Sequence, residues 1–479
     1  MKKIQFGTGG FRGVIGDDFT KEKVQLIAQA LANIIKDNQS TTPVVIGYDN
    51  RFMADFAAMW FANILNGNQI KVLLFTFSVP TPAVMSATRD LKNDFGVMIT
   101  ASHNPYYFNG IKIFTKDGYD ADAEFTNLLE MKISEVKEMK TMCKNEARER
   151  GLLADYADTN SYISHIKSFI QVAPPQNRLK VLFNNMNGVG IIGLAPVVKK
   201  LKIHQFDVIN ADHDAFFGFN LPNPTKEALA GEFTETIKNQ AYDLGMATDS
   251  DGDRLGVIDE RGNYVSNNEI MACLYYYLVV DRGYQGDVVK NCATSILVDL
   301  TAEKLGYRCH EVDVGFKNIT AAMKKHNALL GGESSGGLTA RGYLYGKDAA
   351  FSGALFLEMV MKYQIPVSHM VQKLKDKVGY HYYFEEAFLP LREEPRAVIA
   401  YIAQNIPTFS EPLHRVDHFG NNFKFYFSNR TWMLIRLSGT EPALRIFAEL
   451  KDEMTTKKAV NELLHYVEKV QKIVANKRS

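Results

Sequence analysis

A strand–helix–strand pattern of hydrophobic positions appears three times along the first three quarters of the chain. Short apolar runs predict buried strands, whereas apolar residues spaced three or four positions apart predict helices. The three copies comprise residues 44–49, 54–65 and 70–75, then 179–183, 191–201 and 206–209, and finally 287–289, 296–305 and 310–312. Their similar internal spacing favours three related α/β domains with mixed sheets over one long sheet.

The pattern changes in the last quarter of the chain. Short segments there alternate apolar and polar residues, which is typical of strands with one buried face, and a helical pattern over residues 455–475 closes the chain. The predicted strands are residues 380–388, 423–427, 432–436 and 443–448. We therefore expect a fourth, α+β domain with an antiparallel sheet. The predicted domains are residues 1–152, 153–259, 260–375 and 376–479.

Composition and charge exclude several classes of protein. The 479 residues are 46% hydrophobic, and a formal net charge of +1 gives no general attraction to nucleic acid or an anionic membrane. The longest apolar run, residues 271–280, is too short to cross a bilayer and predicts a buried helix. The N-terminus lacks a signal peptide's apolar stretch, and the widely spaced cysteines predict free thiols. We expect a cytoplasmic protein without nucleic-acid or membrane partners.

The first candidate for chemistry is the hexapeptide T-A-S-H-N-P at residues 100–105. It follows the apolar run 94–99, so Ser102 and His103 should lie in the loop that leaves a buried strand. A Ser-His pair in a loop also occurs as simple turn chemistry. Three further loops favour the catalytic interpretation over simple turn chemistry.

The second loop, D-S-D-G-D-R, carries three carboxylates at Asp249, Asp251 and Asp253. Carboxylates this close repel one another unless a cation lies between them, and their hard oxygen ligands suit Mg²⁺. An EF-hand loop is rejected, because Gly252 precedes the third aspartate and an apolar strand pattern, residues 255–258, follows at once. A solvated acidic turn is the remaining alternative.

Two later loops offer groups for a sugar and for a phosphate. Residues 331–337, G-G-E-S-S-G-G, present one carboxylate and two hydroxyls suited to sugar hydroxyls, and the apolar residues before them disfavour a flexible linker. Arg436 and Arg445 bracket a hydroxyl-containing glycine turn, which suits a phosphate unless it is only a strand-edge turn. The glycine-rich residues 6–13 around Arg12 could hold an anion in the same way, or form a flexible turn.

These loops, in this order, resemble those of the α-D-phosphohexomutase family, the phosphoglucomutases and phosphomannomutases. The resemblance covers essentially the whole chain, and T-A-S-H-N-P together with S-G-T-E-P is highly specific. It implies four domains around a central cleft, the first three sharing an α/β core. It also implies phosphoryl transfer, which depends on charge neutralisation and in-line positioning.

The resemblance assigns roles to individual residues. Ser102 is expected to carry the phosphoryl group, and Asp249, Asp251 and Asp253 to hold Mg²⁺ with an oxygen of that phosphoserine. The other catalytic residues are expected to be His103, Lys112 and Arg12. The expected substrate-binding residues are Arg254, Gly315, Lys317, Glu333, Ser335, Lys347, Arg436, Ser438, Gly439, Thr440 and Arg445.

Two positions depart from the family pattern. Many members carry a histidine, proposed as general base, where this chain has Gly337. Lys112 or Lys347 is the expected replacement, with His103 as a further candidate. The metal loop has Ser250 where glycine is common, which is tolerated if the φ angle there is negative.

The sequence therefore predicts an Mg²⁺-dependent mutase that interconverts hexose 1-phosphate and hexose 6-phosphate. The family mechanism proceeds through a 1,6-bisphosphate, so glucose 1,6-bisphosphate is the expected activator. Glucose phosphate is the preferred substrate and mannose phosphate the next. Phosphoglucosamine is less favoured, because the G-E-Q-S-G-H pattern is absent. A monomer or a homodimer is expected. The alternatives are a sugar phosphatase, a sugar-phosphate-binding protein and, weakest, a Ser-His esterase, which leaves the aspartates unexplained.

Overall fold

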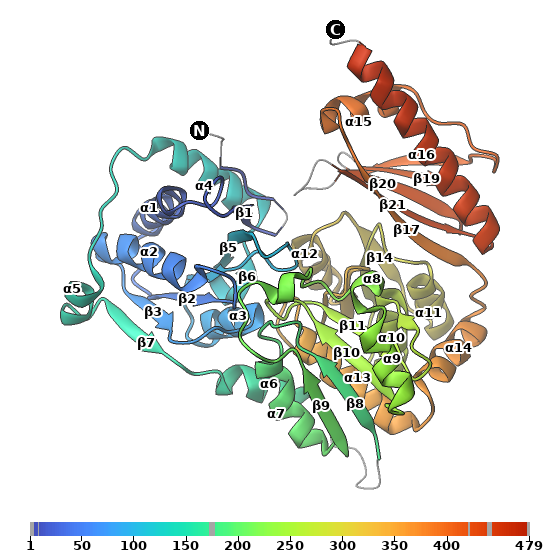
Figure 1. Ribbon diagram of the computed structural model, residues 1–479, viewed down its shortest axis with the longest axis horizontal. Coiled ribbons are helices and arrows are strands. Elements are labelled where there is room, and N and C mark those ends of the chain that lie inside the picture. Colours follow the sequence, from blue (N-terminus) through green and yellow to red (C-terminus); the bar gives the residue numbers. More distant parts are fainter. Residues whose placement is uncertain (1–3, 8, 172–177, 420–421, 438–442, 477–479) are drawn as a thin grey trace.

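The computed structural model describes residues 4–7, 9–171, 178–419, 422–437 and 443–476. Four sheets define four domains, I to IV in chain order, and Figure 1 shows domain IV at the opposite end of the molecule from domain I. The three predicted strand–helix–strand copies are confirmed as parallel units of the first three sheets. They are β2-α2-β3, β8-α7-β9 and β13-α11-β14.

Domain I contains a mixed sheet in the order β1-β5-β4-β2-β3-β7, with β6 paired to β5. Its strands are β1 (Phe11–Val14), β2 (Val44–Tyr48), β3 (Val72–Phe75), β4 (Phe95–Ile99), β5 (Phe108–Thr115), β6 (Tyr119–Asp120) and β7 (Leu153–Tyr156). Its helices are α1 (Lys21–Asp37), α2 (Ala54–Gly67), α3 (Thr81–Asp90), α4 (Ala123–Glu135) and α5 (Lys144–Glu149), with a 3₁₀ turn at Lys116–Gly118.

Domain II contains a mixed sheet in the order β12-β11-β10-β8-β9. Its strands are β8 (Lys180–Asn184), β9 (Gln205–Ile209), β10 (Leu244–Thr248), β11 (Leu255–Asp259) and β12 (Tyr264–Val265). Its helices are α6 (Asn160–Phe169), α7 (Ile191–Leu201), α8 (Lys226–Leu229) and α9 (Glu232–Asn239), with a 3₁₀ turn at Phe217–Phe219.

Domain III contains a mixed sheet in the order β14-β13-β15-β16. Its strands are β13 (Val288–Asn291), β14 (Cys309–Val312), β15 (Leu330–Gly332) and β16 (Leu338–Ala340). Its helices are α10 (Asn267–Val280), α11 (Leu297–Leu305), α12 (Phe316–His326), α13 (Ala349–Tyr363) and α14 (Val367–Val378). Helix α10 is largely buried, as its apolar run predicts.

Domain IV contains an antiparallel sheet in the order β17-β21-β20-β19-β18, which confirms the predicted α+β end of the chain. Its strands are β17 (Tyr383–Pro390), β18 (Arg415–Phe419), β19 (Asn422–Tyr426), β20 (Trp432–Leu437) and β21 (Ala443–Leu450). Its helices are α15 (Pro395–Gln404) and α16 (Glu453–Asn476).

The structure departs from the sequence pattern at several points. The charged residues 132–151 have a helical sequence pattern and predict a joint to the second domain, yet they form the end of α4 and the separate helix α5 rather than one helix. The glycine-rich N-terminal segment continues into β1, which pairs with β5. Strand β7 belongs to the first sheet and β12 to the second, so these sheets extend past residues 152 and 259, where we placed domain boundaries.

One apolar core runs through domains II and III and reaches the face of domain I that carries α3. The opposite face of domain I, beneath α1 and α2, has a core of its own. Domain IV has a separate core and contacts domain III through a smaller apolar cluster around Trp432 and Ile296. No helix in the described ranges combines the length and the apolar character needed to cross a bilayer. The cysteines are all free.

Candidate active site

The predicted functional loops leave the carboxyl ends of strands in three different sheets. The loop of Ser102 follows β4, the aspartate loop begins directly after β10, and the loop of Glu333 follows β15. Ligands of open α/β sheets bind at the carboxyl ends of the strands. The loops meet at a cleft of about 740 Å³ that is lined by residues from all four domains.

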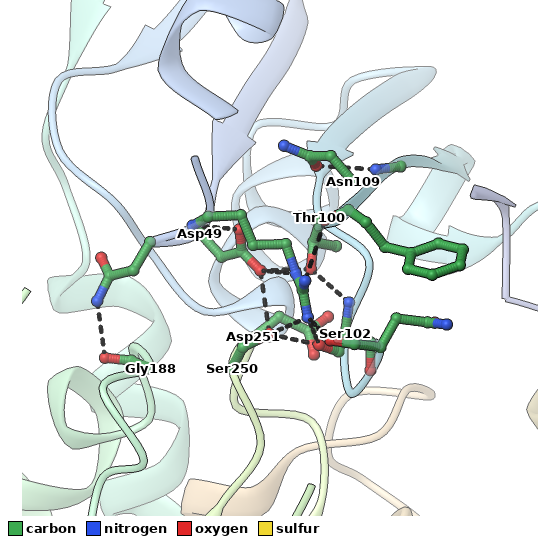
Figure 2. A network of polar contacts seen from close by, with 12 residues as sticks. Asp49, Thr100, Ser102, Asn109, Gly188, Ser250 and Asp251 are labelled. Atoms are coloured by element: carbon green, nitrogen blue, oxygen red, sulfur yellow. Dashed lines mark hydrogen bonds and ion pairs between the residues drawn. The ribbon is translucent and has the colours of Figure 1, made fainter. Parts of the chain in front are cut away.

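Ser102 lies in a tightly held loop. Its side chain is fully buried, and its φ angle of 50° lies in the left-handed region, which costs a non-glycine residue about 1–2 kcal/mol. The Ser102 backbone N–H donates to Thr100 Oγ1 at 2.8 Å, and Thr100 Oγ1 donates to Asp49 Oδ2 at 2.6 Å. Figure 2 shows this network of polar contacts around the loop.

Arg51 holds the Ser102 loop by hydrogen bonds to its backbone. Its guanidinium donates to the backbone carbonyls of Ser102, of Asn104 at 2.6 Å, of Pro105 at 2.8 Å and of Phe108 at 3.1 Å. The side chain is fully buried. We did not predict a role for Arg51 or Asp49. The available signal was two charged residues within three positions of the end of the apolar strand 44–48.

The three predicted metal ligands lie together. One carboxylate oxygen each from Asp249, Asp251 and Asp253 lie within 4.8 Å of one another, and all three residues are buried. Asp249 Oδ2 accepts a hydrogen bond from Ser102 Oγ at 2.8 Å. Asp251 Oδ1 and Asp253 Oδ1 have no hydrogen-bond partner within the described part of the chain. Orphaned buried oxygens of this kind fit a hard divalent cation.

Two lysines compensate part of this negative charge. Lys112 Nζ lies 2.6 Å from Asp251 Oδ2 and 2.8 Å from Asp253 Oδ2, and Lys347 Nζ lies 2.9 Å from Asp253 Oδ2. Burial alone would lower the pKa of Lys112, but the attraction of the two aspartates outweighs it and raises the pKa. Lys112 is therefore a cation here, which does not favour it as the general base.

The pKa values of the aspartates diverge for physical reasons. Burial, and then repulsion by Asp253 and Asp251, raise the pKa of Asp249 well above its ordinary value. Burial also acts to raise the pKa of Asp253, but Lys112, Lys347 and then Arg254 hold it below its ordinary value. The triad thus contains one carboxyl group that resists ionisation beside others that remain ionised.

His103 and Arg12 lie beside the reactive serine. His103 Nδ1 lies 3.4 Å from Ser102 Oγ. Burial, followed by the nearby charges of Arg254 and Arg12, lowers the pKa of His103 well below its ordinary value, so the imidazole is neutral at pH 7. Arg12 donates to Asn104 Oδ1; burial lowers its pKa to about 10, which leaves it charged at neutral pH.

The predicted sugar-binding residues converge from two loops. Glu333 Oε1 accepts from the backbone N–H of Gly315 at 3.1 Å, and Ser335 Oγ donates to Glu333 Oε2 at 3.3 Å. A Cβ atom at Gly337 would lie 2.3 Å from Lys347 Cδ, so the lysine stem fills the space of a side chain there. Of the described residues predicted to bind substrate, Lys317 alone does not line the cleft.

The predicted phosphate-binding arginines are cross-strand neighbours. Arg436 in β20 pairs in register with Arg445 in β21, and both line the cleft. The other predicted members of this group, Ser438, Gly439 and Thr440, lie outside the described residues.

Asp120 is a cleft residue that sequence reasoning missed. It lies in β6, which pairs with β5, the strand that carries Lys112. Burial raises its pKa, with Lys112 and Lys347 opposing the effect. The sequence signal was weak, because a two-residue strand carries no recognisable pattern.

Comparisons with known proteins agree with this architecture. The chain matches three family descriptions, "Phosphoglucomutase/phosphomannomutase, alpha/beta/alpha domain I", "domain II" and "domain III", over residues 3–140, 160–262 and 266–378. It is 29% identical to a phosphoglucomutase/phosphomannomutase of Thermococcus kodakarensis, over 94% of this chain and 95% of that protein. It is also 29% identical to a phosphoglucosamine/phosphogalactosamine mutase of Sulfurisphaera tokodaii, over 97% and 99% of the two chains.

The fold has solved counterparts. A phosphoglucomutase/phosphomannomutase family protein from Burkholderia thailandensis superposes with a TM-score of 0.78 at 20% identity, over 97% of each chain. Fold and cleft together define an isomerase that acts by intramolecular phosphoryl transfer. The chain belongs to the phosphoglucomutase/phosphomannomutase family, the α-D-phosphohexomutases.

Proposed function

We propose that the protein is an Mg²⁺-dependent phosphohexomutase that interconverts hexose 1-phosphate and hexose 6-phosphate through phospho-Ser102 and a 1,6-bisphosphate. One observation carries the proposal. Ser102 Oγ lies 2.8 Å from Asp249 Oδ2, an oxygen of an aspartate triad with two orphaned buried oxygens. A reactive hydroxyl beside such a triad fits phosphoryl transfer better than ester hydrolysis, which needs no metal ligands.

Asp249, Asp251 and Asp253 are the residues that would hold Mg²⁺. When bound, the ion neutralises charge on the transferring phosphoryl group. Lys112 and Arg12 add positive charge on the domain I side of the cleft, and Lys347 adds it on the domain III side. These cations are fixed before the reaction, so little reorganisation is needed as charge develops.

Proton transfer is the second task of the cleft. When the phosphoryl group leaves Ser102 Oγ for a sugar hydroxyl, the P–Oγ bond breaks and a new P–O bond forms. The sugar hydroxyl gives up its proton to a base, and Ser102 Oγ takes up a proton. Neutral His103, 3.4 Å from Ser102 Oγ, is suited to accept or return a proton near that oxygen. Among our candidate bases, this favours His103 over Lys112, because Lys112 is held in its charged form.

The distal half of the cleft would hold the phosphate that is not reacting. Arg436 and Arg445 lie on neighbouring strands and offer two guanidinium groups to one phosphate. Glu333 and Ser335 line the same cleft as this pair and offer oxygen atoms to sugar hydroxyls. The bisphosphate must turn between the two half-reactions, so one set of contacts has to serve both orientations.

Glucose phosphate is the proposed substrate, with mannose phosphate second. An amino-sugar phosphate is a further candidate, because the Sulfurisphaera tokodaii relative is named a phosphoglucosamine/phosphogalactosamine mutase. The sugar loop G-E-S-S-G-G differs from the G-E-Q-S-G-H pattern that we associate with phosphoglucosamine mutases.

Phosphopeptide mapping followed by activity assays tests the proposal. The purified protein would be assayed with Mg²⁺, a trace of glucose 1,6-bisphosphate and, separately, glucose, mannose and glucosamine 1-phosphates. We expect phosphate on Ser102, formation of a 6-phosphate, and no turnover by Ser102→Ala. Release of free phosphate in step with substrate loss would instead indicate a phosphatase. An unlabelled Ser102 and no isomer from any sugar would contradict phosphoryl transfer through this residue.

A further inference from the structure

Ser250 belongs to the metal loop but contacts the serine loop of the neighbouring domain. Its side chain is fully buried, and its hydroxyl donates to the backbone carbonyl of Ser102 at 2.5 Å. Ser250 Oγ also lies 3.2 Å from Asp49 Oδ2 and accepts from Arg51 Nη2 at 3.3 Å. Figure 2 shows Ser250 beneath the loop, facing the Ser102 and Asp49 groups.

The carbonyl of Ser102 therefore receives two donors, one from each domain. Arg51 approaches it from domain I and Ser250 from domain II. A carbonyl oxygen has two lone pairs, so this pair of donors saturates it. On its other side, the Ser102 N–H donates to Thr100 Oγ1. The left-handed backbone of Ser102 is thus held at both of its peptide groups.

Ser250 is itself held firmly by domain II. Val189 N donates to the carbonyl of Ser250 at 3.0 Å, and a Cβ atom at Gly188 would lie 2.9 Å from Ser250 Cα, so these two segments of domain II are in close contact. Ser250 has no positive φ angle, so its backbone does not require glycine. A serine at this position adds a hydroxyl without backbone strain, as our sequence reasoning required.

We propose that Ser250 is a positioning residue that aims Ser102 Oγ at Asp249 by fixing the peptide after Ser102 to the metal loop. The proposal rests on the proposed function, since it assigns a role in the step at Ser102. Ser250 acts through the backbone of Ser102 and touches no residue that we assign to the sugar. Loss of its hydroxyl should therefore slow phosphoryl transfer and leave sugar binding unchanged.

The decisive variant is Ser250→Ala, with Thr301→Val as the matched control. Thr301 Oγ1, in α11, donates to the carbonyl of Leu297 at 2.7 Å and is also fully buried, but Thr301 does not line the cleft and, among the described residues, is hydrogen-bonded to neither the serine loop nor the metal loop. Both substitutions remove one buried hydroxyl-to-carbonyl hydrogen bond, and Ser250→Ala also removes the longer contacts of the hydroxyl with Asp49 and Arg51. A merely structural role would therefore affect both proteins alike, whereas a positioning role affects only Ser250→Ala.

Enzyme labelled on phospho-Ser102 would be mixed with glucose 1-phosphate, and the loss of label followed by rapid quench, beside steady-state kcat and KM. We expect Ser250→Ala to lose about 10- to 100-fold in transfer rate and kcat, with KM within about threefold of wild type. Thr301→Val should transfer at the wild-type rate. Equal rates for Ser250→Ala and wild type, or a loss confined to KM, would overturn the proposal.

Two further results separate the possible failures. If wild-type enzyme does not pass its label to any hexose phosphate, the proposed function fails and the positioning role fails with it. If wild type transfers label and Ser250→Ala does so equally fast, only the positioning role fails. Should Ser250→Ala not fold, Ser250→Cys keeps a weaker donor at the same place and should show an intermediate transfer rate. A wild-type rate in the folded Ser250→Cys would contradict the proposal.

Discussion

Two groups of buried carboxylates in this molecule differ in how completely their oxygens are hydrogen-bonded. Glu449, at the contact of domains III and IV, is fully buried and accepts from Ser295 Oγ at 2.5 Å, Tyr380 OH at 2.7 Å, Ile296 N at 2.8 Å and Trp432 Nε1 at 3.1 Å. Both of its oxygens are satisfied by donors of the protein. Such a group specifies how two domains fit together and has no acceptor left for a ligand.

The aspartate triad between domains I and II is the opposite case. One oxygen from each of its three carboxylates lies within 4.8 Å of the others, and Asp251 and Asp253 each keep a buried oxygen without a hydrogen-bond partner in the described chain. Lys112 and Lys347 offset only part of the charge. The difference teaches how to interpret a buried carboxylate. One whose hydrogen bonding the protein leaves incomplete indicates a functional site, whereas one whose oxygens are all satisfied has a structural role.

Removal of divalent cations should have the largest effect. Chelation with EDTA is expected to lower mutase activity by about 10³-fold, since neutralising transition-state charge is worth several kcal/mol, and added Mg²⁺ should restore it. The measurement is initial rate against free Mg²⁺. Glu449→Gln should show the same Mg²⁺ requirement as wild type. Full activity in EDTA would mean that the orphaned oxygens of the triad need no cation.

Substitution of Arg51 should come next. Arg51→Met removes a buried guanidinium that holds four carbonyls of the serine loop and leaves Asp49 without its charged partner, 3.4 Å away. Breaking a buried charge pair costs about 3–5 kcal/mol, and the misplaced Ser102 should abolish measurable activity. Urea unfolding gives the stability.

The matched control is Arg430→Met. Arg430 pairs with Glu303 at 3.2 Å on the surface, and the loss there should stay below about 1 kcal/mol. Comparable losses in the two variants would mean that Arg51 contributes no more than an exposed ion pair.

The sequence predicted those parts of the molecule that depend on local pattern. The three strand–helix–strand copies follow from the periodicity of their apolar residues, and the aspartate triad follows from its own spacing. Strand β1 could not be predicted in this way, because its glycine-rich segment becomes a strand only by pairing with β5. The charged residues 132–151 fit a helical pattern, yet the chain leaves the helix between α4 and α5.

The candidate site shows the same division. Ser102, the aspartates, Glu333 and the arginine pair carry recognisable motifs. Glu333 and the arginine pair line one cleft, and Ser102 and the aspartates lie together behind its Lys112 and His103. Arg51 and Glu449 carry no motif. Their partners come from distant parts of the chain, and their role is visible only when a loop closes around the side chain or two domains meet. Nonlocal hydrogen bonding of this kind leaves no periodic signal in a sequence.

Glu449→Gln should destabilise the contact of domains III and IV. An amide group replaces one acceptor oxygen with a donor that faces other donors, so at least one buried hydrogen bond to a charged group is lost, at about 2–3 kcal/mol. Burial raises the pKa of Glu449, but its hydrogen bonds oppose that shift. Urea unfolding of this variant and of Glu468→Gln, an exposed position on α16, provides the comparison. Equal stability of both variants would show that the four donors do not depend on a carboxylate.

The smallest expected effect is the pH dependence of stability that comes from Asp348, a second buried carboxylate with hydrogen-bond donors of the protein around it. Asp348 accepts from Tyr343 OH at 2.6 Å, Phe351 N at 3.0 Å and Tyr162 OH at 3.1 Å, and burial outweighs these bonds and raises its pKa to about 6. The native state therefore binds more protons than the unfolded state between the ordinary pKa of 3.8 and about 6. The stability contributed by Asp348 is full below that range and is lost as pH rises through about 6.

Asp348→Asn has no such proton to lose. Its free energy of unfolding, relative to wild type, should increase by about 1 kcal/mol between pH 5 and pH 8. Urea unfolding of both proteins across this range measures the difference, and parallel pH profiles would contradict a raised pKa. A raised pKa at Asp348 would show that hydrogen bonds from neutral donors do not fully offset burial, so that the carboxyl group is protonated more easily than in water. The triad, by contrast, keeps Asp253 ionised with lysines, which is the state that a metal ligand requires.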